Sequence, residues 1–293
     1  MNRLVRAELF KLRTTSAWWM FLLATVASTV AMLVVNAVNA HGLLQSFDQY
    51  VTLHLHSPGD KLPADFLARL HSEWLTGHSA VTQAAALFTS GQLIGLLLSC
   101  LLGIVLVTTE YHHQTATNTF LITPRRGSLI RAKLLTASLL AVMAWLISTV
   151  ISVVAGSVFL HTQGFGAQLA QWGVDRAILL NLAAYIIWAV FGVGFGALVR
   201  NQLAATVSAT VLYLVGATGA GAVFDLINTY VLNKTWVLAA QVIVPPEASS
   251  IMISPTKLFT ESPPQWVGAA VLVGYGLVFG ILGTRRIRRR DIA

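Results

Sequence analysis

Six long apolar segments, separated by polar ones, make up most of this chain. They lie at about residues 17–38, 81–108, 134–160, 177–199, 203–224 and 266–283. Each is close to or above the ~20 residues that a helix needs to cross roughly 30 Å of hydrocarbon. Because the bilayer core offers no water to unpaired backbone groups, such segments cross it as helices. The pattern therefore predicts an all-α polytopic membrane protein with six transmembrane helices in a single domain, 1–293.

A shorter apolar segment precedes the sixth span. Residues 235–244 are too few to cross a bilayer, and Pro245-Pro246 follows them directly. Proline lacks the N–H that would continue a helix. We interpret this part of the 225–265 segment as a re-entrant or extracellular helix.

The N-terminal segment, residues 1–16, alternates apolar and basic positions at helical spacing. The apolar positions on one face are Val5, Leu9 and Leu12, and the basic ones on the other are Arg3, Arg6 and Arg13. Such a helix lies in the plane of the membrane interface. We expect an interfacial elbow helix before span one, although a merely basic flank remains an alternative.

Charge places the loops on the two sides of the membrane. Only 10% of residues are charged, against about 25% in soluble domains. Of the 19 Lys and Arg residues, 14 lie in the N-terminal segment, the 110–133 segment, the loop after span four and the 284–293 tail. The positive-inside rule predicts that these parts are cytoplasmic, both termini included, and that loop 39–80 is extracellular. The basic tail is expected to meet anionic lipid of the plasma membrane rather than nucleic acid.

Cofactor and metal chemistry finds little support in the residues. None of the five Lys follows a Gly, so the chain lacks the P-loop that cradles nucleotide phosphates, and we expect no cofactor in this chain. The lone Cys100 sits in an apolar segment, which excludes a disulfide framework. His54 and His56 could hold Zn or Cu in an extended segment, but we favour a polar, partly helical extracellular cap.

Small and polar residues mark the spans. A stripe of small residues recurs every four positions along span two and predicts close helix packing: Gly91, Gly95, Ser99 and Gly103. The polar intramembrane residues are uncharged and include Thr89, Gln92, Ser208, Thr210 and Tyr213. Because proton and ion pathways usually carry ionisable groups, these residues favour amphipathic or lipid-like cargo, or simply hydrogen bonds between helices.

Two polar motifs complete the picture. Glu8, Lys11 and Thr14 precede Trp18-Trp19 with the spacing Glu-x-x-Lys-x-x-Thr. Glu110, Thr115, Pro124, Arg126 and Lys133 follow in order through the basic island after span two. Together with the six spans, these motifs resemble the permease subunits of ABC-2-type ABC transporters. The chain departs from the pattern at Gln114, where that family commonly has Gly.

The resemblance implies an ATP-driven exporter whose separate ATPase chain binds ATP and Mg²⁺. It implies a cytoplasmic coupling helix at residues 115–122, flanked by Glu8, Lys11 and the elbow helix. The residues that it assigns to ATPase coupling are Glu110, Thr115, Thr117, Asn118, Phe120, Pro124, Arg126 and Lys133. It also implies a homodimer, or a pairing with a similar chain, around a pathway lined by spans two and five.

Two other function classes stay open. One is a non-ATP channel or a membrane-anchored partner protein. The other is a membrane enzyme, although no Ser/His set, Asp pair or His-Glu-x-x-His motif lies at depth.

Overall fold

The computed structural model describes residues 2–14, 17–44, 66, 80–112, 126–232, 234, 236–258 and 262–289. Within these ranges the regular structure is entirely helical, and six helices or helix pairs are long and apolar enough to cross a membrane. They are Trp18–Gly42, Ala80–Tyr111, Gly127–Thr162, Trp172–Val199, Gln202–Val231 and Gln265–Arg285. The predicted all-α fold with six spans is therefore confirmed.

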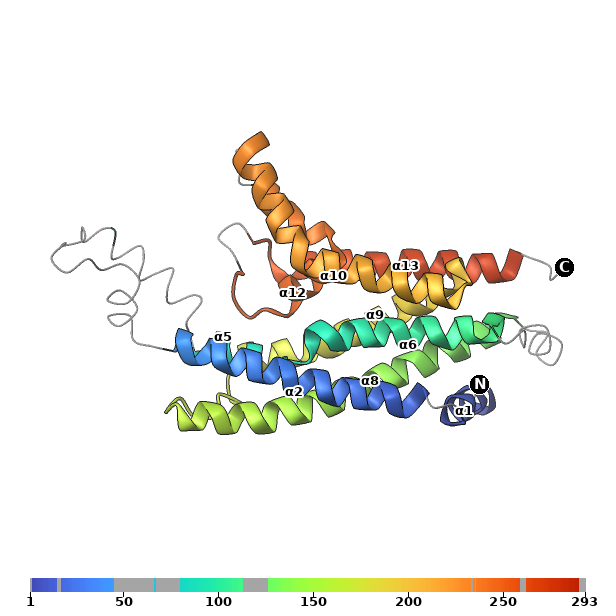
Figure 1. Cartoon of the computed structure of the whole chain (residues 1–293), viewed down its shortest axis with the longest axis horizontal. Helices are drawn as coiled ribbons and strands as arrows, with labels where there is room; N and C mark the ends of the chain where they lie inside the picture. The colour runs from blue at the N-terminus through green and yellow to red at the C-terminus, as the bar shows by residue number, and fades with distance from the viewer. Residues whose placement is uncertain are drawn as a thin grey trace.

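Helix α1 (Asn2–Arg13) precedes the six spans. The spans are α2 (Ala17–Leu43), α5 with α6 (Ala80–Phe88, Gln92–His112), α8 (Arg126–Thr162), α9 (Trp172–Val199), α10 with η1 (Gln202–Ile227, Asn228–Leu232) and α13 (Gln265–Arg289). Figure 1 shows α1, the end of α6 and the end of α13 at the same end of the bundle. The N-terminal residues predicted to be helical are helical, whereas the position of α1 in a membrane interface stays a prediction.

The core lies where α6 crosses α9. A Cβ added to Gly103 would lie 2.4 Å from the carbonyl oxygen of Ala189, and one added to Gly192 would lie 2.0 Å from that of Cys100. Only glycine permits two backbones to approach so closely. Gly95 serves a different contact, because its added Cβ would meet the hydroxyl of Tyr185 at 1.9 Å. Not every member of the small-residue stripe therefore faces a backbone.

The second span is broken rather than continuous. Helix α5 ends at Phe88 and α6 begins at Gln92, with Thr89, Ser90 and Gly91 between them. The Thr89 hydroxyl donates to the Ala85 carbonyl, and the Ser90 hydroxyl donates to the Leu87 carbonyl. Serine and threonine that bond back to their own helix, next to a glycine, are known to interrupt the regular hydrogen bonding of a helix. The sequence pattern predicted a single run at 81–108 and missed this break.

Two short helical segments fold back between α10 and α13. The first segment consists of helix α11 (Trp236–Ala239) and η2 (Ala240–Ile243), and the second is α12 (Pro245–Ile253). The helix axis bends by 103° between the two segments. The prolines end one segment and begin the next, because proline suits the first turn of a helix. Most of α12 is buried, including Ala248, Ser249 and Ile251.

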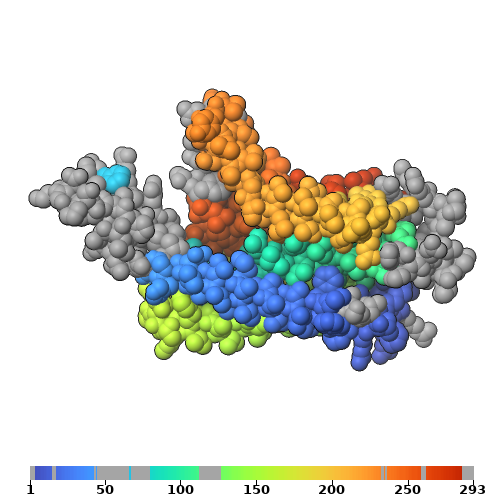
Figure 2. All heavy atoms as spheres, viewed as in Figure 1, coloured from blue at the N-terminus to red at the C-terminus, as the bar shows by residue number. Residues whose placement is uncertain are grey.

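The remaining spans expose wide apolar surfaces. In Figure 2, α2 (blue) and α10 (yellow to orange) lie along one face, and α6 (green) shows as a band between them. In α2, Val34 and Val38 are 58% and 68% exposed, and in α10 Leu203 is 74% exposed. In a soluble protein such surfaces would cause association, whereas in a membrane they contact lipid or another chain.

Candidate functional site

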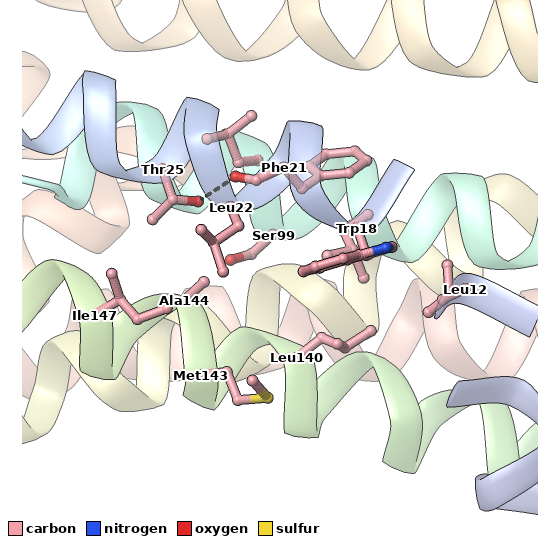
Figure 3. Close-up of a pocket in the computed structure, with 12 residues that line it drawn as sticks. Leu12, Trp18, Phe21, Leu22, Thr25, Ser99, Leu140, Met143, Ala144 and Ile147 are labelled. Carbon is pink, nitrogen blue, oxygen red and sulfur yellow. Dashed lines mark hydrogen bonds between the residues drawn. The ribbon is translucent and has the colours of Figure 1, made fainter. Parts of the chain in front are cut away.

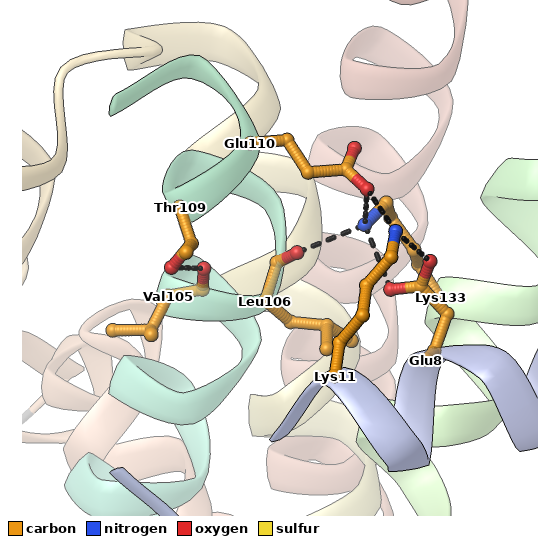
Figure 4. Close-up of polar contacts among 7 residues, drawn as sticks. All are labelled: Glu8, Lys11, Val105, Leu106, Thr109, Glu110 and Lys133. Atoms are coloured by element: carbon orange, nitrogen blue, oxygen red, sulfur yellow. Dashed lines mark hydrogen bonds and ion pairs between the residues drawn. The ribbon is translucent and has the colours of Figure 1, made fainter. Parts of the chain in front are cut away.

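Four charged residues from three helices meet at the end of the bundle that carries α1. Glu8 and Lys11 lie on α1, Glu110 lies near the end of α6, and Lys133 lies in the second turn of α8. We call these four residues the charge cluster. Figure 4 shows both ammonium groups between the two carboxylates.

The contacts in the charge cluster are short. The Lys11 ammonium lies 3.1 Å from Glu8 Oε1 and 2.8 Å from Glu110 Oε1. The Lys133 ammonium lies 2.9 Å from Glu8 Oε2 and 3.1 Å from Glu110 Oε1, and it also donates to the Leu106 carbonyl at 3.0 Å. Each carboxylate therefore contacts both lysines, and the cluster carries no net formal charge.

Burial differs sharply within the cluster. The Lys133 and Glu8 side chains are 5% and 4% exposed, and that of Lys11 is 49% exposed. Charges taken out of water are tolerated only when they are paired and hydrogen-bonded. Burial lowers the pKa of Lys11, but its hydrogen bond and charge attraction to Glu110, with the charge of Glu8, outweigh this and raise the pKa above 10.5. Lys11 is thus held in its charged form at neutral pH.

Two members of the charge cluster flank the 113–125 segment in the sequence and bind α1. Glu110 stands just before this segment and Lys133 stands shortly after it, and both bind residues of α1. The cluster therefore links α1 to both α6 and α8.

The sequence motifs selected all four members of the cluster but did not indicate that they bind one another. The other coupling candidates, Thr115, Thr117, Asn118, Phe120 and Pro124, lie outside the described residues, as do His54 and His56. Arg126 begins α8. Within the described ranges, no group of three His, Cys, Asp or Glu residues could hold a metal ion.

The pathway candidates divide into two groups. Thr89, Gln92 and Tyr213 line a polar cavity of about 240 Å³ beside the break between α5 and α6. By contrast, the Ser208 and Thr210 hydroxyls donate back to carbonyls of their own helix, Ala204 and Thr206. Asn36, Ser90 and Ser250 also line this cavity and were not assigned to the pathway by the sequence.

Two further spaces are apolar. One, of about 350 Å³, lies between α9, α10, α12 and α13, and Tyr213 and Pro246 line both it and the polar cavity. The other is a narrower groove of about 100 Å³ between α2, α6 and α8. Figure 3 shows Trp18 and Leu22 on one side of this groove and Leu140 and Met143 on the other. Such linings accept hydrocarbon.

Six membrane-spanning helices, cavities between them and a charge cluster at one end define a multi-pass membrane protein. A family model described as "ABC-2 family transporter protein" matches residues 64–217, slightly more than half of the chain. The chain belongs to this family and is a membrane transport component of the permease type, not by itself a catalytic enzyme. No curated protein sequence matches it.

Proposed function

We propose that this permease subunit works with a separate ATPase chain, which binds ATP and Mg²⁺, and exports an amphipathic or lipid-like small molecule. The observation that carries the proposal is the charge cluster, which binds α6 and α8, the helices before and after the 113–125 segment, to α1. Closure of an ATPase against this segment would move α6 and α8 as a unit, because both are tied to α1 through buried ion pairs.

The orientation follows from where the basic residues lie. The 14 basic residues assigned to one side belong to segments that meet at the α1 end of the bundle, and this end is cytoplasmic in our proposal. The protein then lies in the plasma membrane with both termini inside. A second copy, or a similar permease chain, completes the transporter, with surrounding lipid as the remaining partner.

Site-directed crosslinking tests the proposal. Cysteines placed at Thr117 and Asn118 should crosslink to the ATPase that co-purifies with the chain. A cysteine at Phe165, in the turn at the opposite end of α8 and 38% exposed, is the matched control and should not. The native Cys100 is buried and so does not compete for the reagent. Crosslinks from Phe165 alone, or from none of the three sites, would refute the proposed coupling.

A further inference from the structure

Two cavities of opposite character adjoin inside one copy of the chain. The polar cavity lies between α2, the α5–α6 break, α10 and α12, and the apolar one lies between α9, α10, α12 and α13. Tyr213 and Pro246 line both of them, so the two spaces meet at these side chains. Their volumes, about 240 and 350 Å³, together fall in the ~300–1,000 Å³ range of small-molecule sites.

The polar cavity has unused hydrogen-bonding capacity. The Asn36 amide nitrogen donates to the Ala86 carbonyl and the Ser90 hydroxyl, which leaves its amide oxygen as an acceptor. In the described part of the chain, no residue hydrogen-bonds the Gln92 side-chain amide, which can both donate and accept. A ligand with hydroxyl or amide groups would find complementary partners here.

The apolar cavity has a rigid aromatic wall. Phe191 lies 4.6 Å from Phe279 and Trp188 lies 4.9 Å from Tyr213, measured between ring centroids. The polar atoms of this wall are already bonded, since the Trp188 indole donates to the Ser249 hydroxyl and the Tyr213 hydroxyl donates to the Leu93 carbonyl. The rest of the lining is predominantly hydrocarbon, which favours an alkyl chain or an apolar ring.

Charge selects the kind of head group. Among the described residues that line the two cavities, none carries a formal charge. A charged head group would lose its hydration without gaining a counter-ion, which is costly.

We propose that the two cavities form one binding site for an amphiphile with an uncharged, hydrogen-bonding head group. The head occupies the polar cavity beside Asn36 and Gln92, and the apolar part lies against Trp188 and Phe279. This inference deepens the proposed function, because the ligand would be the cargo. The site itself needs neither ATP nor the ATPase.

Photolabelling of the full chain alone, in phosphatidylcholine nanodiscs, tests the site. The probe is a monoacylglycerol with a diazirine in its acyl chain, and a fatty acid and an alkylamine with the same chain serve as anionic and cationic counterparts. Peptide mass spectrometry should find the neutral probe attached near Phe195, Leu212 or Phe279. Equal or stronger labelling of these residues by either charged probe would overturn the proposal.

Two variants and one control sharpen the result. Gln92→Leu removes head-group hydrogen bonds and should weaken labelling about tenfold. Ala209→Trp fills the apolar cavity and should abolish labelling there. Met143→Trp fills the separate groove of Figure 3 instead and should leave labelling unchanged. Gln92 is only half-buried, so its substitution tests the site even if the larger change at Ala209 disturbs folding.

The possible outcomes are separable. Labelling that is unaffected by both Gln92→Leu and Ala209→Trp, or confined to lipid-exposed residues such as Val34, would overturn the site. Because the ATPase is absent, a failure here leaves the crosslinking test of ATPase coupling standing. Labelling without any ATPase crosslink would instead refute the coupling and keep the site.

Discussion

Removing the charge of Lys133 should detach α1 from the bundle. The Lys133 side chain is 5% exposed. Its ammonium has three oxygen partners within 3.1 Å, from Glu8, Glu110 and Leu106. Lys133→Met would leave two nearby carboxylates with only Lys11 to neutralise them. Breaking a buried pair by removing one partner costs about 3–5 kcal/mol. At about 1.4 kcal/mol per tenfold change, opening of α1 should rise at least a hundredfold.

Amide hydrogen exchange of α1 in nanodiscs measures this opening directly. Lys11→Met is the matched control, because the Lys11 side chain is 49% exposed and water can replace much of its interaction. Exposed pairs contribute about 0.2–1 kcal/mol, so its effect should stay within about fivefold. Exchange in the α6–α9 core reports on global folding and should change little in either variant.

A second substitution separates lost charge balance from lost packing. Adding Glu8→Gln to Lys133→Met leaves Glu110 and Lys11 as a balanced pair, so α1 should recover part of its protection. Equal exchange in the Lys133→Met and Lys11→Met variants would contradict the argument from burial. The double variant offers a second check. If its α1 exchanged faster than that of Lys133→Met, by as much as Glu8→Gln alone adds, the argument would also be contradicted.

Three further predictions concern packing, topology and pH. Gly192→Ala should destabilise the chain by about 1–3 kcal/mol in thermal unfolding, because its Cβ would lie 2.0 Å from a carbonyl oxygen. Gly274→Ala, with nothing within 4 Å of its Cβ, should not, and equal stabilities would refute the close crossing. A cysteine replacing Lys234 should react with an impermeant maleimide on intact cells, and one replacing Arg125 should react only after lysis; the reverse pattern would invert the topology. Because the pKa of Lys11 is raised, its contribution to holding α1 is complete below pH 10.5 and is lost only as the pH rises through the raised value. Accessibility labelling of α1 should therefore stay constant up to pH 10.5. An increase in the labelling of α1 near neutral pH would disprove this prediction.

The sequence alone came close to a full account of the spans. Hydrophobic length decides whether a helix can cross a bilayer, and this property belongs to each segment separately. The same holds for α1, whose helical spacing is local, and for the turn at Pro245, where proline acts on its own backbone. These features therefore needed no knowledge of which helices are neighbours.

The break in the second span needed more than local pattern. Thr89, Ser90 and Gly91 are compatible with a straight membrane helix, and hydropathy does not distinguish the two states. In the fold, the Tyr185 hydroxyl donates to the Gly91 carbonyl at 3.0 Å, which partners a backbone oxygen beside the break. A contact from 94 residues away thus supports the break.

What the sequence determined by itself is therefore the number of spans, the class of protein and the residue types at its polar end. Only the tertiary structure decided that Glu8 and Lys133, 125 residues apart, share one buried ion pair. Only it decided that Gln92 and Trp188 line adjoining cavities while Ser208 turns back to its own helix. The physical reason is that membrane insertion depends on the composition of each segment. Contacts between helices depend on their rotation and crossing, which close backbone packing at Gly103 and Gly192 sets.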